Sequence, residues 1–128
     1  MSVTKVPFDA GILGKRPGQP VLVHPRQMAT GIDVDCLRGK VYWTDTTGRS
    51  IRRANYDGSE SEVVLDRDMG FPEGLAIDWV ARNLYWTDSG KRTIEVVNLD
   101  SKIRFAKLNC QYSYVLPTEK SLFQIRFD

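Results

Sequence analysis

One tetrapeptide occurs twice in the chain, 43 residues apart, and this repeat constrains the fold more than any other feature. Tyr-Trp-Thr-Asp stands at residues 42–45 and again at residues 85–88. The same offset aligns the flanking residues without a gap, pairing Gly31 with Gly74, Asp35 with Asp78, Arg49 with Arg92, Ile51 with Ile94 and Asn55 with Asn98. Two units in register over this length indicate a repeated supersecondary structure.

Each unit is predicted to fold as four short strands. Residues 31–35 alternate apolar and polar side chains, residues 40–45 are rich in β-branched and aromatic side chains, and residues 49–55 alternate again. A fourth strand is expected at residues 61–65, and turn signals that contain glycine separate the strands. A four-stranded unit that repeats every 43 residues is typical of β-propeller blades, whose sheets pack both faces against neighbouring sheets.

Composition excludes several classes of function. The 128 residues include 18 Lys and Arg against 16 Asp and Glu, and a net charge of +2 is too balanced for a nucleic-acid or anionic-membrane surface. No apolar run approaches the roughly 18 to 20 residues of a membrane-spanning helix, and no secretory signal is visible at the N-terminus. The chain is therefore expected to have no membrane span and no nucleic-acid partner.

Cysteine and histidine are too sparse for a structural metal site. Cys36 and Cys110 lie far apart without a paired cysteine, and His24, the one histidine, does not complete a zinc spacing with them. The two cysteines could form one disulfide or remain two thiols, and His24 is expected at the surface. The sequence also lacks a nucleophile elbow, a phosphate-binding glycine loop and a metal cluster. We therefore expect a binding protein with no enzyme activity, metal or cofactor.

The aromatic residues of the repeated motif are expected to pack between blades. Adjacent residues of a strand point to opposite faces, so Tyr42 and Tyr85 would serve one face of their sheets and Trp43 and Trp86 the other. A ligand-stacking role for these rings is the alternative, but burial of such large apolar surfaces in the core is the stronger expectation.

The polar motif residues are expected to hold turns. Asp45 and Asp88 end their strands and could accept turn N–H groups or pair with a nearby arginine, and Thr44 and Thr87 could satisfy local backbone groups. A calcium or acid–base role for the carboxylates is weaker, because no cluster of oxygen ligands accompanies them.

The presumed inner strand of each unit begins with a glycine and ends with an aspartate. Gly31 and Gly74 begin the presumed inner strands, where crowding leaves no room for a side chain. Asp35 and Asp78 end those strands and could stabilise the next turn or face the mouth of the axial channel. The possible partner-facing set is Asp35, Asp78, Arg49 and Arg92.

These motifs resemble the YWTD repeats of the low-density lipoprotein receptor group, whose members form six-bladed β-propellers. The runs Gly-Ile-Asp-Val-Asp-Cys at 31–36, Gly-Arg-Ser-Ile-Arg-Arg-Ala at 48–54 and Pro-Glu-Gly-Leu-Ala-Ile-Asp at 72–78 are most similar to the nidogen (entactin) branch of that group. The resemblance covers approximately residues 20 to 104. It implies an all-β chain that is an incomplete fragment, about two and a half blades, of a six-bladed propeller.

The resemblance also implies a domain organisation. Residues 1–30 are interpreted as the end of a truncated preceding blade, residues 31–73 as the first YWTD blade, residues 74–104 as the second, and residues 105–128 as a tail outside the family that could complete a strand. An incomplete ring exposes blade faces, which favours partner binding or self-association. The chain is therefore expected to be a fragment or a short isoform.

The resemblance implies a binding function in the extracellular matrix. A nidogen-like chain would link basement-membrane components and bind laminin, with affinity that is weak or absent where the binding surface is only partly present. The alternative is the propeller of an endocytic receptor related to the low-density lipoprotein receptor, which would require acid-sensitive release of its ligand. A propeller hydrolase with axial calcium is the third and least supported reading.

Overall fold

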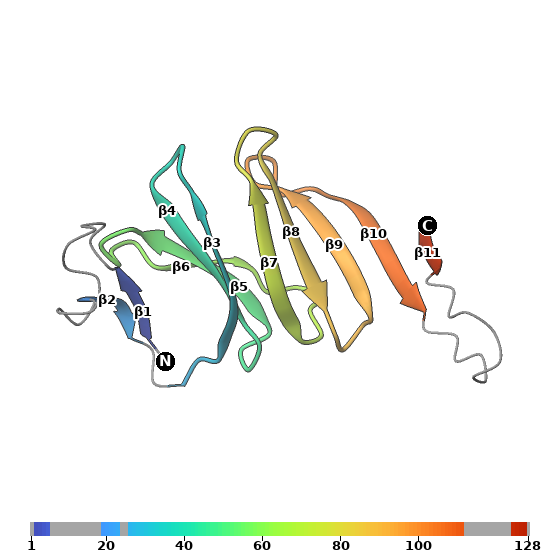
Figure 1. Cartoon of the computed structure of the whole chain (residues 1–128), viewed down its shortest axis with the longest axis horizontal. Coiled ribbons are helices and arrows are strands. Elements are labelled where there is room, and N and C mark those ends of the chain that lie inside the picture. Colours follow the sequence, from blue (N-terminus) through green and yellow to red (C-terminus); the bar gives the residue numbers. More distant parts are fainter. Residues whose placement is uncertain (1, 6–18, 24–25, 112–123, 128) are drawn as a thin grey trace, which may run out of the picture.

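The computed structural model describes residues 2–5, 19–23, 26–111 and 124–127, which form three antiparallel sheets and no helix (Figure 1). The strands are β1 (Ser2–Lys5), β2 (Gln19–Val23), β3 (Ala29–Asp35), β4 (Lys40–Asp45), β5 (Ser50–Asn55), β6 (Glu62–Leu65), β7 (Pro72–Asp78), β8 (Asn83–Asp88), β9 (Thr93–Asn98), β10 (Arg104–Gln111) and β11 (Gln124–Phe127). β1 pairs only with β2, β3 to β6 form a four-stranded sheet, and β7 to β11 form a five-stranded sheet in chain order. The predicted all-β class is confirmed.

The two larger sheets follow the two units of the sequence repeat. β3 to β6 lie in the first unit, and β7 to β10 repeat the same up-and-down order in the second. β10 runs across residue 105, where the tail was expected to begin, and β11 pairs with it as a fifth strand.

Backbone geometry sets the strand ends where they differ from the sequence pattern. β3 begins at Ala29 rather than Gly31, because Ala29 still pairs with Asp45 across an irregularity in the ladder. β5 begins after Arg49, whose φ of 49° is left-handed and does not fit an extended strand. Arg92 has the same conformation in the second unit, with a φ of 58°, so the repeat extends to the backbone of the turns.

The two larger sheets pack against each other, and the inner strands β3 and β7 lie side by side (Figure 1). Tyr42 and Ile51 of the first sheet are buried in one cluster with Leu84, Trp86 and Val97 of the second. The opposite face of the first sheet has its own cluster, formed by Val41, Trp43 and Ala54. Tyr42 and Trp43 therefore serve opposite faces, which is the packing of consecutive propeller blades.

Polar contacts hold the inner strands together where the sheets meet. The Thr44 hydroxyl donates to the Glu73 carbonyl at 2.7 Å, and the Thr46 hydroxyl donates to the Pro72 carbonyl at 2.7 Å. The Asp33 carboxylate accepts the Ile77 N–H at 2.7 Å. These bonds satisfy backbone groups of β7 and fix its register on the first sheet.

Candidate protein-binding surface

The strand-ending aspartates of the motif lie buried at one end of the blades, beside the β4–β5 and β8–β9 turns. Asp45 Oδ1 accepts the N–H of Gly48 at 2.9 Å. The Asp88 carboxylate accepts the N–H groups of Gly70 at 2.6 Å, Phe71 at 2.9 Å and Lys91 at 3.0 Å. Both side chains are almost wholly inaccessible, so their carboxylates order turns and are not open to a ligand.

Asp88 gives the fold an acid-sensitive element. Burial opposes ionisation of Asp88, but the three backbone donors and the Lys91 charge outweigh it and lower its pKa below the ordinary value. Because the folded-state pKa is depressed, the stabilisation is present above the unfolded-state pKa of about 3.9 and is lost as pH falls through the folded-state pKa. Asp88→Asn is expected to lower the free energy of unfolding by about 1 to 3 kcal/mol at neutral pH, measured by urea denaturation.

The control for Asp88→Asn is Asp66→Asn, an exposed position that makes the same change in charge. This control is expected to stay within about 0.5 kcal/mol of the unmodified chain. The deficit of the Asp88 variant should shrink as the pH is lowered below the ordinary carboxyl range. A deficit that stays constant down to about pH 2 would contradict the proposed role of the Asp88 charge.

The four candidate partner-facing residues do not form one site. Asp35 and Asp78 lie at the end of the blades that holds the β3–β4 and β7–β8 turns, whereas Arg49 and Arg92 lie in the turns at the opposite end. Asp35 is completely buried, while Asp78 is exposed and accepts the N–H groups of two turn residues, one of them Val80 at 3.1 Å. Arg49 lies over the ring of Phe71, directly before β7, and is exposed, as are Asp78 and Arg92, so only Asp35 of the four is closed to a partner.

An ion-pair network links the blades at the Asp35 end. Arg82 of the second unit pairs with Asp35 of the first at 2.8 Å and with Asp100 at 3.4 Å. Arg38 reaches Asp100 at 3.4 Å from the first unit. The network fixes the β3–β4 and β7–β8 turns relative to each other, so side chains on both turns are presented in a defined arrangement.

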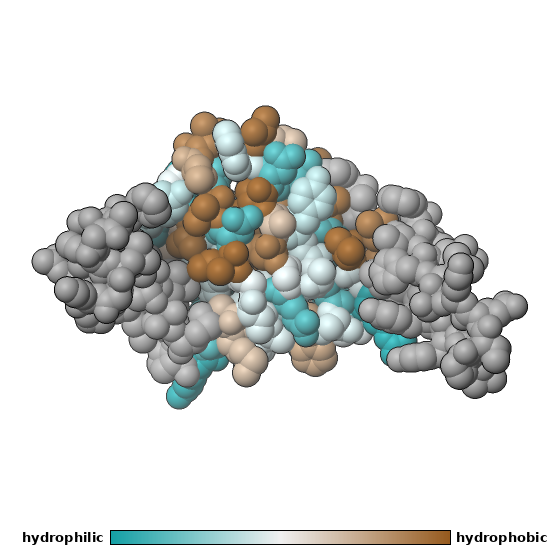
Figure 2. Space-filling view, in the orientation of Figure 1, coloured by the Kyte–Doolittle hydropathy of each residue, from teal (hydrophilic) through white to brown (hydrophobic). Residues whose placement is uncertain are grey.

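Large apolar side chains stand exposed on these turns. We call them the apolar rim: Leu37 is 63% exposed, Trp79 46%, Val80 73%, and Ile103 of the neighbouring β9–β10 turn 62%. Figure 2 shows hydrophobic side chains over β3 and β7 and over the turns at their upper ends. Apolar groups clustered on an exposed surface mark interaction sites, and a tryptophan among them is a suitable anchor.

Sequence reasoning missed the apolar rim, although a signal was available. Trp79 and Val80 follow directly after strand-ending Asp78, where a turn normally carries small or polar residues. The equivalent positions of the first unit hold Cys36 and Leu37. Two bulky apolar residues side by side in an exposed turn make this turn a candidate interaction site.

The remaining chemistry of the described part of the chain is limited. No group of three or more His, Cys, Asp or Glu side chains in it is placed to hold a metal ion. No helix in the same residues is long and apolar enough to cross a membrane. Cys36 is an exposed free thiol, whereas His24 and the side chain of Cys110 lie outside what the structure describes.

Comparisons with known proteins agree with this architecture. Residues 39–79 match the model of the low-density lipoprotein receptor repeat class B. Human nidogen-1 is 37% identical over 72 residues, which is 56% of this chain and 6% of nidogen-1. Human low-density lipoprotein receptor-related protein 5 is 51% identical over 46 residues, 36% of this chain and 3% of that protein. A chain from the crystal structure of a nidogen/laminin complex superposes with a TM-score of 0.74 at 34% identity, covering 81% of this chain and 40% of the other.

The paired sheets, with their motif aromatics buried on opposite faces, have the packing of consecutive β-propeller blades, and the match over residues 39–79 relates this part of the chain to the class B repeat of the low-density lipoprotein receptor. In both sequence and fold the chain is similar to nidogen. It spans only a small part of the curated relatives and covers part of a propeller.

Proposed function

We propose that the chain is a non-enzymatic, extracellular protein-binding module of the basement membrane, with laminin as its partner. The observation that carries this proposal is the superposition of 81% of the chain on a chain of the nidogen/laminin complex. Sequence identity of 34% in that alignment supports a shared ancestry beyond the fold, although function still depends on the site rather than on the architecture.

The apolar rim is the part of the described surface that best fits such a partner. It combines an exposed tryptophan with exposed aliphatic side chains, and protein interfaces concentrate their binding energy in aromatic anchors surrounded by other contacts. Arg38 and Asp100 stand beside the rim as a surface ion pair and would supply its polar border. Hydrophobic contact to Trp79 is therefore the expected main contribution to binding.

The test is binding of the full 128-residue chain to immobilised purified laminin, with human nidogen-1 as the reference. The chain is expected to bind reversibly and more weakly than nidogen-1, because it covers only part of the propeller. The double variant Trp79→Ala with Val80→Ser is expected to lose about tenfold or more in affinity, the result of removing a central aromatic contact.

The matched control for the rim variant is Met28→Ser, an exposed apolar residue beside Asp45 at the opposite end of the blades from the rim. Its affinity for laminin should equal that of the unmodified chain. Complete lack of laminin binding, or equal loss of binding in the rim and control variants, would overturn the proposal. Affinity equal to that of nidogen-1 would contradict the expectation that only part of the surface is present.

A receptor propeller is the second candidate function, and the 51% identity to receptor-related protein 5 over 46 residues favours it. Such a chain would release its partner in acid. Binding to laminin measured at pH 7.4 and pH 5.5 separates the two candidates, since a matrix linker should retain its partner at both values.

The open blade faces also favour self-association. Self-association is distinct from laminin binding because it uses the sides of the blades and not the rim.

A further inference from the structure

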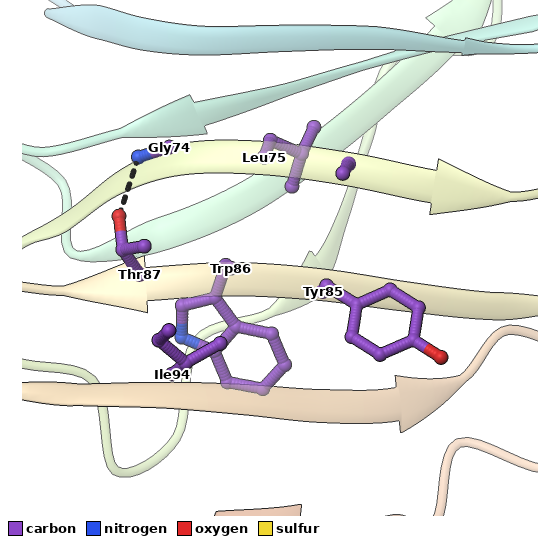
Figure 3. A pocket seen from close by; sticks show the side chains of 7 residues that line it. Gly74, Leu75, Tyr85, Trp86, Thr87 and Ile94 are labelled. Carbon is purple, nitrogen blue, oxygen red and sulfur yellow. Dashed lines mark hydrogen bonds between the residues drawn. The ribbon is translucent and has the colours of Figure 1, made fainter. Parts of the chain in front are cut away.

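One face of the second blade has an apolar hollow, and Figure 3 shows side chains that line it. The hollow has a volume of about 280 Å³ and lies over β7, β8 and β9; the residues that line it are Gly74, Leu75, Ala76, Tyr85, Trp86, Thr87 and Ile94. Its surface is almost entirely apolar, and 39% of the Tyr85 side chain is accessible to solvent. We call this surface the following face, because the next blade of an array would stand on it.

The internal repeat shows what this kind of surface binds. Tyr42, Thr44 and Ile51 occupy the same positions in the first unit and are completely buried beneath the second blade. Their counterparts Tyr85 and Thr87 are exposed. The following face is therefore chemically a blade-binding face, with the same residue types as the filled one.

The chain also exposes the β3 part of the matching surface on its first blade, whereas the part around Trp43 is buried. Ile32 and Val34 of β3 are 54% and 40% exposed, and they pair across the sheet with the residues on the Trp43 side. The repeat aligns them with Leu75 and Ile77, which pack on the core between the two blades. We call the surface around Ile32 and Val34 the preceding face. The chain thus has an open following face and a preceding face that is open along β3.

We propose that the following face of one copy binds the preceding face of a second copy, head to tail. β3 of the incoming copy would lie where β7 lies against the first blade. The Thr87 hydroxyl already accepts the Gly74 N–H at 2.8 Å (Figure 3), as the Thr44 hydroxyl accepts the Gly31 N–H at 2.8 Å. Thr44 also donates its proton to a carbonyl of the next inner strand, so the Thr87 proton is positioned to do the same toward an incoming β3.

Two differences between the units make this contact weaker than the one inside the chain. Ala76 is the repeat equivalent of Asp33, whose carboxylate accepts an amide N–H of the next inner strand, and alanine cannot accept that bond. Gly39 of the incoming copy would take the position that Arg82 has inside the chain, so the contact would lack an equivalent of the ion pair between Arg82 and Asp35. The Trp43 side of the first sheet is already buried, so the contact centres on β3. Association is therefore reversible and depends on concentration.

A head-to-tail contact predicts a distinctive assembly behaviour. Each bound copy keeps one free face of the opposite kind, so growth continues beyond two copies until a ring closes or a filament forms. A symmetric contact between two following faces would stop at a dimer. The two arrangements are therefore distinguishable by mass.

The experiment is sedimentation velocity of the full chain over a wide concentration range, with one variant for each face. Tyr85→Lys places a charge in the following face and Ile32→Lys places one in the preceding face, both at accessible positions. The unmodified chain is expected to form species larger than a dimer, and each variant alone should be monomeric. An equimolar mixture of the two variants retains one intact face of each kind and should form dimers that grow no further.

Ser61→Lys, at an exposed position between β5 and β6, is the control and should assemble like the unmodified chain. Circular dichroism of every variant establishes that it is folded. A monomer at all concentrations, an assembly that either face variant leaves intact, or a mixture that stays monomeric would each overturn the proposal. A dimer that Ile32→Lys does not dissociate would show the symmetric contact instead.

Discussion

Replacing Gly31 by alanine is expected to lower the free energy of unfolding by about 2 to 3 kcal/mol, the upper range for forcing extra atoms into a packed core. A Cβ atom at this position would lie 2.2 Å from the Glu73 carbonyl oxygen and 2.9 Å from the Leu75 amide nitrogen. Both are backbone atoms of β7, so they cannot move aside as a flexible side chain can. β3 and β7 would have to separate, which weakens the Thr44 and Asp33 bonds between the sheets.

The second repeat supplies the control for Gly31→Ala. A Cβ atom at Gly74 would meet only the Thr87 side chain, with its hydroxyl oxygen at 3.0 Å, and no strand of the described residues stands on that face. Gly74→Ala is therefore expected to cost about 1 kcal/mol or less. Chemical denaturation of both variants measures the difference. Equal losses would show that β3 and β7 do not touch as described.

Replacing Trp86 by alanine is expected to cost about 3 to 5 kcal/mol, the range for removing a large buried aromatic side chain. Trp86 is 1% exposed and lies in the core between the blades, together with Tyr42 and Leu84. The Arg104 guanidinium stands 5.2 Å from the centre of its ring, and this cation–π contact would also be lost. Thermal and urea unfolding measure the effect.

Trp79→Ala is the matched control for Trp86→Ala, because it removes the same side chain from an exposed position in the rim. Its effect on stability is expected to remain within about 0.5 kcal/mol. The two tryptophans are thus expected to separate stability from binding: Trp86 supports the fold, and Trp79 is the proposed partner contact. A large loss of stability for Trp79→Ala would contradict this division.

The repeat made most of the architecture predictable. A period of 43 residues with alternating strands was sufficient to predict four-stranded blades, and adjacency along a strand was sufficient to place Tyr42 and Trp43 on opposite faces. Strand ends were less accurate, because the left-handed backbone of Arg49 and the ladder irregularity after Ala29 leave no clear mark in the amino-acid pattern.

Contacts that depend on how one blade sits on the next were not predictable from a single sequence. The bond between Asp33 and the Ile77 amide joins residues 44 positions apart. The pairing of Asp35 with Arg82 uses an arginine whose equivalent in the first unit is Gly39. Repeat comparison identifies what the units share, whereas these interactions arise from what the units do not share.

Candidate partner-facing residues were the least predictable part of the site. The sequence pattern places Asp35 and Asp78 at equivalent strand ends, but only the structure distinguishes the buried, arginine-paired Asp35 from the exposed Asp78. The sequence likewise does not reveal that Trp79 is exposed, because this depends on whether another element packs over the β7–β8 turn. Burial is a property of the assembled blades and not of either repeat.

Packing of β3 directly against β7 is the central claim of this account, and proton NMR of the isotopically labelled chain tests it most directly. The α-protons of Gly31 are expected to give strong nuclear Overhauser effects to the amide proton of Leu75. One of these protons points in the direction that a Cβ atom would take, and a Cβ atom there would lie 2.9 Å from the Leu75 nitrogen. Absence of these effects in a chain whose β4 and β8 resonances remain well dispersed would show that the two sheets fold without stacking as consecutive blades.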